Sequence, residues 1–441
     1  MNSKTSLFSK SIFKSDIKRF WWLGLLNAGI IFTLVVMPVY NRCIEDIGIT
    51  YYDSMYKKPN WDFGTFMIII LFAICTGILL FSYLHKARGV AGHHSLPVTR
   101  GQLYRTKLVS GAALLYTPII INALLFVIML GSDACSKCFG IGDILSWVAV
   151  GALYVWIVFS LTVFVNMMTG YSIGAVVFTV GFMILPLIIT SASCVILEEE
   201  LYGYCDNFSY VVTQYIYISE QNLLHMPYCM VYIVMGLLFL VGAYFLYKRR
   251  KLENYGEVIA VSWLKPVFIA IVGIFSSIMS YMYFAAYFDI EGIWYIIPLG
   301  VVGTVIAWMI SRKSLSLKGV WKPIVIYIAS ALVVCGIIKL DVVGFEDRTP
   351  DLDRIDRGEI GGVVITDREQ IADIVTFQEH MIATKNIDRK GWEYAYINYQ
   401  YKDGGTMLRR YRWNREIDGE YAKADVWQPT DEPASTESVS E

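Results

Sequence analysis

The chain has 441 residues, of which 56% are hydrophobic and only 17% are charged, whereas soluble domains carry about 25% charged residues. A chain of this composition cannot cover its apolar surface by folding on itself, which excludes an ordinary soluble protein. The net charge of −1 hides an asymmetry, because residues 341–441 hold 22 acidic and 13 basic side chains while residues 1–340 hold 16 and 24. The net charge of the whole chain therefore gives no reason to expect nucleic acid as a partner.

The N-terminal segment 1–19 carries five Lys or Arg residues among apolar residues that gather on one side of a helix. This pattern predicts a cytoplasmic amphipathic helix lying in the membrane interface. A plain positively charged lead into a signal anchor explains the same charges equally well, and we expect no cleavable signal peptide.

Nine windows are long and apolar enough to cross the ~30 Å hydrocarbon layer as helices. Because lipid offers no partner to exposed backbone polar groups, these windows must be helices packed against one another. The predicted fold is an all-α polytopic membrane bundle of about nine helices. The windows are 20–40, 66–84, 108–130, 144–166, 173–197, 227–247, 266–288, 293–310 and 323–340.

The connections give the orientation, because Lys and Arg concentrate on the cytoplasmic side. With the N-terminus inside, the inner segments hold 19 Lys and Arg residues and the outer segments hold four. We therefore expect a multi-pass protein of the plasma membrane with a cytoplasmic N-terminus and an extracytoplasmic C-terminal domain. The inner segments are 1–19, 85–107, 167–172, 248–265 and 311–322, and the outer ones are 41–65, 131–143, 198–226 and 289–292.

The C-terminal region predicts a small extracytoplasmic α+β domain over 341–428. Its expected elements are a strand at 361–366, a helix at 367–386 and a hairpin at 392–413. The helix places Ile371, Ile374, Val375 and Met381 inward. The Asp-rich stretch 351–357 is interpreted as a solvated linker, and 429–441 as a disordered tail. Alternation places Arg410 and Arg412 on one face, where they bind an anionic envelope component or pair with the domain's own acids.

Motifs that would give the chain its own chemistry are missing from the sequence. There is no G-x-x-x-x-G-K-[ST] phosphate loop, no H-E-x-x-H and no G-x-S-x-G, so we expect a protein that is not an enzyme and has no metal site. The span interiors contain no Asp, Glu, Lys, Arg or His, which disfavours a carrier driven by an ion gradient. The sequence leaves open whether the outward cysteines Cys43, Cys135, Cys138 and Cys205 form disulfides.

The inner loop 85–107 has five basic residues and no acidic one. Ser95 is a good helix cap and Pro97 is tolerated in a first turn, so a short helix under the membrane is expected to begin here. Thr99 is a second capping residue. The loop is either exposed to a cytoplasmic partner or only held near anionic lipid headgroups.

Short stretches at these loops and in the C-terminal region carry a family likeness. They are 94–100 (HSLPVTR), 247–253 (YKRRKLE) with 256–257 (GE), 344–346 (GFE) with Pro350, and 401–404 (YKDG) with 409–411 (RRY). In these stretches the chain resembles the permease subunits of ABC transporters of the ABC-2 type, particularly those of Gram-positive bacteria with an extracytoplasmic C-terminal domain.

The resemblance implies a six-helix unit at 20–247, a cytoplasmic loop at 248–265 and three additional helices at 266–340. It also implies partners in the lipid bilayer and beside it: two copies of an ABC ATPase subunit, and a second permease subunit that is identical or different. This chain would bind no cofactor, whereas the partner would use ATP and Mg. The implied docking loop is Ser95, Leu96, Pro97, Thr99, Arg100, Leu103 and Arg105, with Arg249, Arg250, Glu253 and Glu257 in the second loop.

Two functions therefore stay open. The first is a permease powered by a separate ATPase, acting as an exporter or in envelope stress or antimicrobial resistance. The second is a membrane-anchored sensor or scaffold whose outer domain binds an envelope ligand. Neither the substrate nor the direction of transport follows from the sequence.

Overall fold

The structure, a computed structural model, describes residues 8–44, 57–205, 228–250, 256–288, 292–387 and 392–419. Nine helices within these ranges are long and apolar enough to cross a membrane. This confirms the predicted helical membrane protein with a small sheet near its C-terminus. Glu253 and the predicted tail 429–441 lie outside the described residues.

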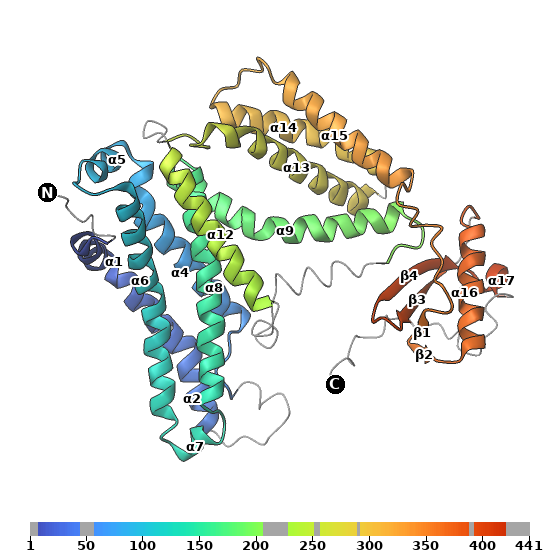
Figure 1. Cartoon of the computed structure of the whole chain (residues 1–441), viewed down its shortest axis with the longest axis horizontal. Helices are drawn as coiled ribbons and strands as arrows, with labels where there is room; N and C mark the ends of the chain where they lie inside the picture. The colour runs from blue at the N-terminus through green and yellow to red at the C-terminus, as the bar shows by residue number, and fades with distance from the viewer. Residues whose placement is uncertain are drawn as a thin grey trace. The chain divides into compact units, whose positions relative to one another are not determined.

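The helices extend past the predicted apolar windows because their polar end residues are also helical. Figure 1 shows the long helices and the C-terminal sheet. The long helices are α1 (Lys10–Ile31), α4 (Phe63–Phe81), α6 (Arg100–Met129), α8 (Ile141–Met168), α9 (Ser172–Glu200), α12 (Tyr228–Arg249), α13 (Lys265–Phe288), α14 (Ile296–Arg312) and α15 (Trp321–Lys339). The short ones are α2 (Met37–Ile44), η2 (Ser82–His85), α5 (Ala87–His94) and α7 (Asp133–Ser136).

The chain packs into two compact units, and the predicted division into six plus three helices stays a prediction. The division within α9 falls at Pro186, where proline removes a helical hydrogen bond. Unit 1 comprises Met1–Leu185, Gln214–Phe268 and Met309–Leu315, and unit 2 comprises Pro186–Thr213, Ile269–Trp308 and Ser316–Glu441.

The first span is one helical rod, Lys10–Ile44. Residues 10–19 of the predicted interfacial helix belong to α1 without a break. Between α1 and α2, Phe32–Val36 is π-helical. Pro38 comes two residues after this segment ends, and since proline has no N–H and crowds the preceding turn, a widened turn relieves the clash. The distortion next to Pro38 therefore takes a π-helical form.

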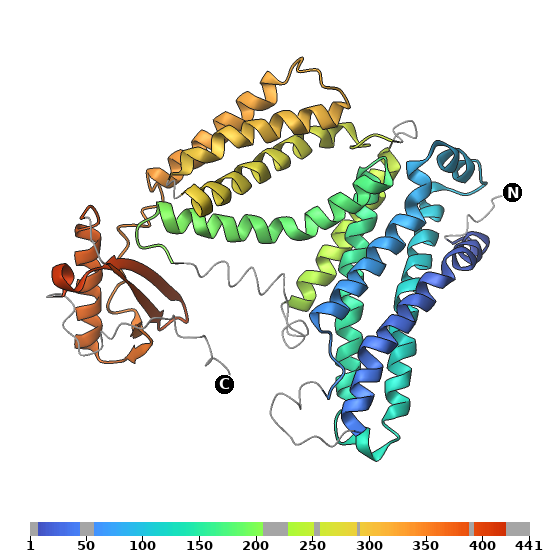
Figure 2. The same ribbon diagram turned by 180° about the vertical axis from the view of Figure 1, so that it is seen from behind.

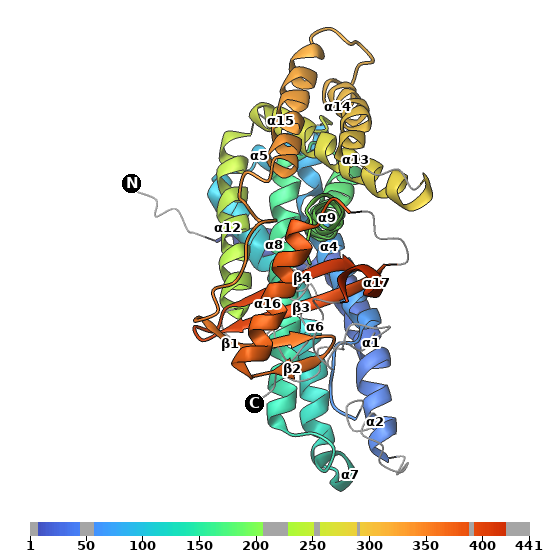
Figure 3. The same ribbon diagram turned by 90° about the vertical axis from the view of Figure 1, so that its right-hand side faces the viewer.

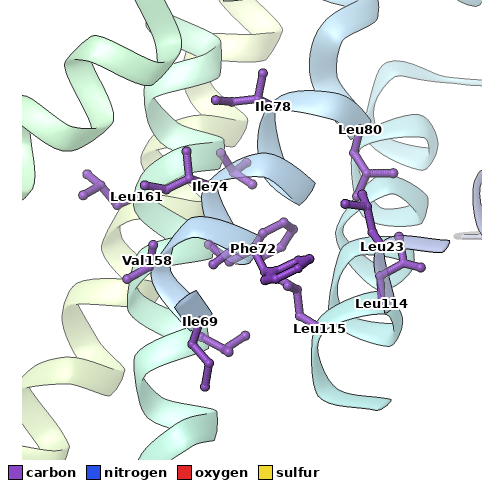
Figure 4. Close-up of a cluster of buried hydrophobic side chains, with 14 of the residues drawn as sticks. Leu23, Ile69, Phe72, Ile74, Ile78, Leu80, Leu114, Leu115, Val158 and Leu161 are labelled. Carbon is purple, nitrogen blue, oxygen red and sulfur yellow. The ribbon is translucent and has the colours of Figure 1, made fainter. Parts of the chain in front are cut away.

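The core of unit 1 lies between α4, α6 and α8. Figure 4 shows Phe72 of α4 beside Leu115 of α6, with Val158 of α8 in the same layer. In lipid the hydrophobic effect does not drive helices together, so close packing must hold them. At Gly151 of α8 a Cβ would come within 2.6 Å of the Trp61 ring, so only glycine lets these segments approach.

Three helices of unit 2 meet at one polar junction. The hydroxyl oxygen of Tyr327 in α15 lies 2.5 Å from that of Ser277 in α13 and 3.0 Å from the carbonyl oxygen of Ile296 in α14. A Cβ at Gly303 would overlap the side chain of Ser276. Small residues and one hydrogen-bonded tyrosine thus join α13, α14 and α15.

The C-terminal domain is a four-stranded antiparallel sheet in the order β2-β1-β3-β4. Helix α16 (Arg368–Ala383) covers one face (Figure 2). The four predicted inward residues of this helix are all buried, and the predicted hairpin is present. The remaining elements are β1 (Ile355–Ile360), β2 (Val363–Ile365), β3 (Glu393–Tyr401), β4 (Thr406–Trp413) and α17 (Arg415–Asp418).

Strand β1 corrects the predicted linker at 351–357. Its Asp356 and Arg357 are exposed, whereas Ile355 and Ile360 are buried. The pairing with β3 shifts register between Ile355 and Arg357. This irregularity breaks the strict alternation by which a half-buried strand is recognised in a sequence.

Candidate functional site

Four of the predicted inner segments meet at one end of unit 1. The amide of Ser9 donates to Oγ1 of Thr106 at 3.0 Å. The amide of Gly170 donates to the carbonyl of Glu257 at 2.7 Å. Arg100 reaches the carbonyl of Lys248 at 3.2 Å. Segments far apart in sequence that were assigned to one side of the membrane by their charge are therefore joined at one end.

The short helix in the first inner loop lies before Ser95 and does not begin there. Helix α5 ends at His94, and the Ser95 amide donates to the carbonyl of Ala91 at 3.0 Å. Proline disfavours helical geometry in the residue before it, so Leu96 and Pro97 form a bend instead of a first turn. The predicted capping by Thr99 is present, because its Oγ1 accepts from the amide of Gln102 at 3.2 Å and α6 begins.

The predicted docking residues divide by exposure. Leu96 is 41% exposed although it is apolar, while Leu103 is 1% exposed and belongs to the core. The side chains available to a partner are those of Ser95, Leu96, Pro97, Thr99 and Arg105. The loop therefore presents a short exposed face that contains one apolar residue, just before α6 and on its first turns.

Arg100 ties the first inner loop to the second. Its Nη1 donates to the carbonyl oxygens of Tyr247, Lys248 and Arg250, at 3.5, 3.2 and 3.3 Å. These carbonyls end α12, where a helix leaves acceptors without intrahelical partners and where positive charge is favoured. Arg100 is therefore a structural tie within the chain, which the sequence did not reveal.

Arg250 makes a second tie and is only 5% exposed. It donates to the carbonyl oxygens of Asn166, at 3.0 Å, and Leu84, at 3.1 Å. Burial lowers the pKa of this guanidinium to about 10. In the same loop Arg249 is exposed, and Glu257 pairs with Lys265 at 2.8 Å. Arg250 thus ties the end of α12 to the end of α8 and to η2, the short helix that continues α4.

An ion pair that the sequence did not predict lies beside this end. Asp16 of α1 and Lys107 of α6 are 2.7 Å apart, with side chains 8% and 4% exposed. The hydroxyl of Ser110 donates to the same carboxylate at 3.2 Å. Asp16 lies four residues before Phe20 and seven before Leu23, both buried on the same face of α1. This helical spacing is the signal that could have revealed it.

A second candidate site is a cavity of about 420 Å³ within unit 2. It lies between the end of α9 and the surface of β3 and β4 opposite α16. The lining is polar and aromatic. It includes Glu198, Glu199, Glu200, Glu346, Lys385, Trp392, Tyr394, Arg410 and Arg412.

Two arginines of β4 connect the hairpin to the end of α9. Arg410 lies 3.3 Å from Glu198, and its guanidinium is 4.7 Å from the ring centre of Tyr394. Arg412 lies 3.8 Å from Glu199 and stacks in the same way on Trp392. The predicted single face for both arginines is confirmed. Their partners are acids of the membrane helix, which corrects the expectation that they pair with the domain's own acids.

Among the described residues no group of three His, Cys, Asp or Glu side chains is placed to hold a metal ion. What the two candidate sites offer is hydrogen bonding and charge. No protein-family model, no curated protein and no solved structure matches this chain.

Proposed function

We propose that the chain is the permease subunit of an ATP-driven membrane transporter of the ABC-2 type, powered by a separate ATPase. The observation that carries the proposal is the exposed Leu96 loop on a braced end of unit 1. The exposed side chains of this loop stand on a support that Arg100 and Arg250 hold in place, and a pre-ordered surface lowers the cost of docking a protein partner. The sequence has no phosphate loop of its own, so the energy must come from the partner.

The hydrogen bonds of Thr99, Arg100 and Arg250 give a route by which movement of the loop would reach the membrane helices. A displacement of the loop acts on α6 directly, because Thr99 caps that helix. It acts on α12 through Arg100, and on α4 and α8 through Arg250. Closure of a docked ATPase would thus move four helices together. This is how the proposed permease would switch its opening.

The buried pair Asp16–Lys107 refines the argument against an ion-coupled carrier. The helices do contain ionisable groups, but the two neutralise each other and share hydrogen bonds. An ion-binding carrier needs a group that gains and loses its ion during transport. A compensated pair suits a structural role, and the proposal of an external energy source stands.

The test is co-purification of an ATPase subunit with the full-length chain from native membranes. Leu96→Asp combined with Arg105→Glu should abolish co-purification and leave the amount of folded permease unchanged, because both side chains are exposed. Leu315→Asp is the matched control: Leu315 is 84% exposed in another predicted inner segment and should have no effect. Arg100 is left intact, because its loss would disturb the bundle itself.

If the double variant keeps its ATPase partner, or if no ATPase co-purifies with the wild-type chain, the proposal is wrong. The second outcome would favour the alternative, a sensor or scaffold. The cavity at Glu198, Glu199, Arg410 and Arg412 supports that alternative, because it offers polar and aromatic groups to a ligand on the outer domain. Deleting residues 345–441 and assaying transport would separate the two roles.

A further inference from the structure

Three cysteines from two distant segments converge at the other end of unit 1. Cys43 lies in α2, and Cys135 and Cys138 lie in and just after α7. These two short helices are side by side in both views of the molecule (Figure 1 and Figure 3). Cys43 and Cys135 are buried in the same hydrophobic core, and Cys138 packs against it.

The three sulfurs differ in access. Cys135 is completely buried and Cys43 is 8% exposed, whereas Cys138 is partly exposed. The thiol of Cys138 also donates to the carbonyl of Ala134 at 3.3 Å, which holds it on the surface of α7. An external reagent therefore reaches Cys138 first, and Cys43 is the thiol placed to react next.

We propose that these cysteines form a thiol–disulfide exchange site, which accepts oxidation from a disulfide reagent through Cys138 and closes a Cys43–Cys138 bond. The site joins the end of the first span to the connection between α6 and α8. Both segments are predicted to face outward, where oxidising conditions let disulfides persist. The inference rests on that orientation and is independent of the proposed ATPase.

The step balances with a disulfide-bearing oxidant. The Cys138 thiolate attacks one sulfur of that disulfide, the oxidant's S–S bond breaks, and a mixed disulfide forms as the first thiolate leaves. The Cys43 thiolate then attacks the Cys138 sulfur and expels the second thiolate. The two protons from Cys43 and Cys138 end on the released thiols, so the oxidant is reduced to two thiols by two electrons.

Cys135 stays reduced in this scheme. It has no solvent access, so an external disulfide cannot reach its sulfur. Its place inside α7 makes it a packing residue. The C-x-x-C spacing alone would have suggested a bond between Cys135 and Cys138, so the two pairings are distinguishable.

The experiment uses membranes that contain the full-length chain, treated with glutathione disulfide. After acid quenching and alkylation of free thiols in denaturant, peptides digested without reductant are analysed by mass spectrometry. The expected product is a cross-linked peptide that contains Cys43 and Cys138, with Cys135 alkylated. Cys75 and Cys229, in membrane helices, serve as internal controls and should stay alkylated. Dithiothreitol should remove the cross-link.

Two variants test the order of reaction. Cys135→Ser should keep the cross-link, and Cys138→Ser should lose it because no accessible thiol remains to start the exchange. A bond between Cys135 and Cys138 in the wild-type chain would overturn the proposal. So would three alkylated thiols after oxidation, or a cross-link that survives Cys138→Ser. The disulfide mapping of the wild-type chain needs no substitution. It therefore tests the proposal even if one of the variants fails to fold.

Discussion

Two ion pairs of the same length show how differently the helix bundle and the C-terminal domain use charge. In unit 1, Asp16 and Lys107 are 2.7 Å apart and have side chains 8% and 4% exposed. In the C-terminal domain, Arg354 and Asp403 are also 2.7 Å apart but are 63% and 56% exposed. Water screens the second pair and is excluded from the first. The distance between two charges therefore says little until their burial is known.

The largest effect is expected from breaking the buried pair. Asp16→Asn or Lys107→Met leaves one uncompensated charge away from water, which should lower the free energy of unfolding by about 3–5 kcal/mol. The measurement is thermal unfolding of the purified chain in detergent. The double variant D16N/K107M removes both charges and should recover much of the loss. Single variants as stable as the wild type would mean that the pair is open to water.

A smaller effect is expected at the Thr99 cap, which is a neutral hydrogen bond at an exposed helix end. Thr99→Ala removes the acceptor for the Gln102 amide and should reduce stability by about 1 kcal/mol. Thr99→Ser keeps the hydroxyl and should behave like the wild type in the same unfolding assay. Equal losses in the two variants would show that the methyl group, and not the hydrogen bond, matters.

The smallest effect is expected from the exposed pair. Asp403→Asn should leave the melting temperature unchanged at neutral pH, because solvent screens both groups. The hydrogen bond from Arg354 lowers the pKa of Asp403 below its usual range. Any stabilisation by this carboxylate is therefore present above about pH 4 and is lost as the pH falls through the lowered pKa. Unfolding curves of wild type and D403N, compared at neutral and acid pH, check this, and a large difference at neutral pH would contradict it.

The spans and the hairpin were predictable because their signals are local. Windows of apolar residues must be helical in lipid, and alternation around Gly404 marks a hairpin. Strand β1 was missed because its register shift breaks the pattern that identifies a strand. The short inner-loop helix was placed too late in the chain, because Pro97 acts as a bend after α5 and not as a first-turn residue.

The candidate site was only partly predictable. Leu96 and Thr99 were found from sequence, and they are exposed as expected. The roles of Arg100 and Arg250 were not found, because both bind carbonyl oxygens of residues 84 to 166 positions away. Carbonyls carry no sequence signature, so the partners of such arginines can only be identified in the folded chain.

The sequence by itself determined that this chain crosses a membrane, roughly where it does so, and that a small α+β domain follows, since each of these depends on composition and local periodicity. The tertiary structure decided which charges are buried together, which loops are held together by arginines and which cysteines share a core. Asp16 and Lys107 form a buried ion pair although they are 91 residues apart, and Cys43 and Cys138, 95 residues apart, pack in one core. Only tertiary packing brings residues so far apart in the chain close together. For the charged pair, the interaction energy in a low-dielectric interior depends on that closeness.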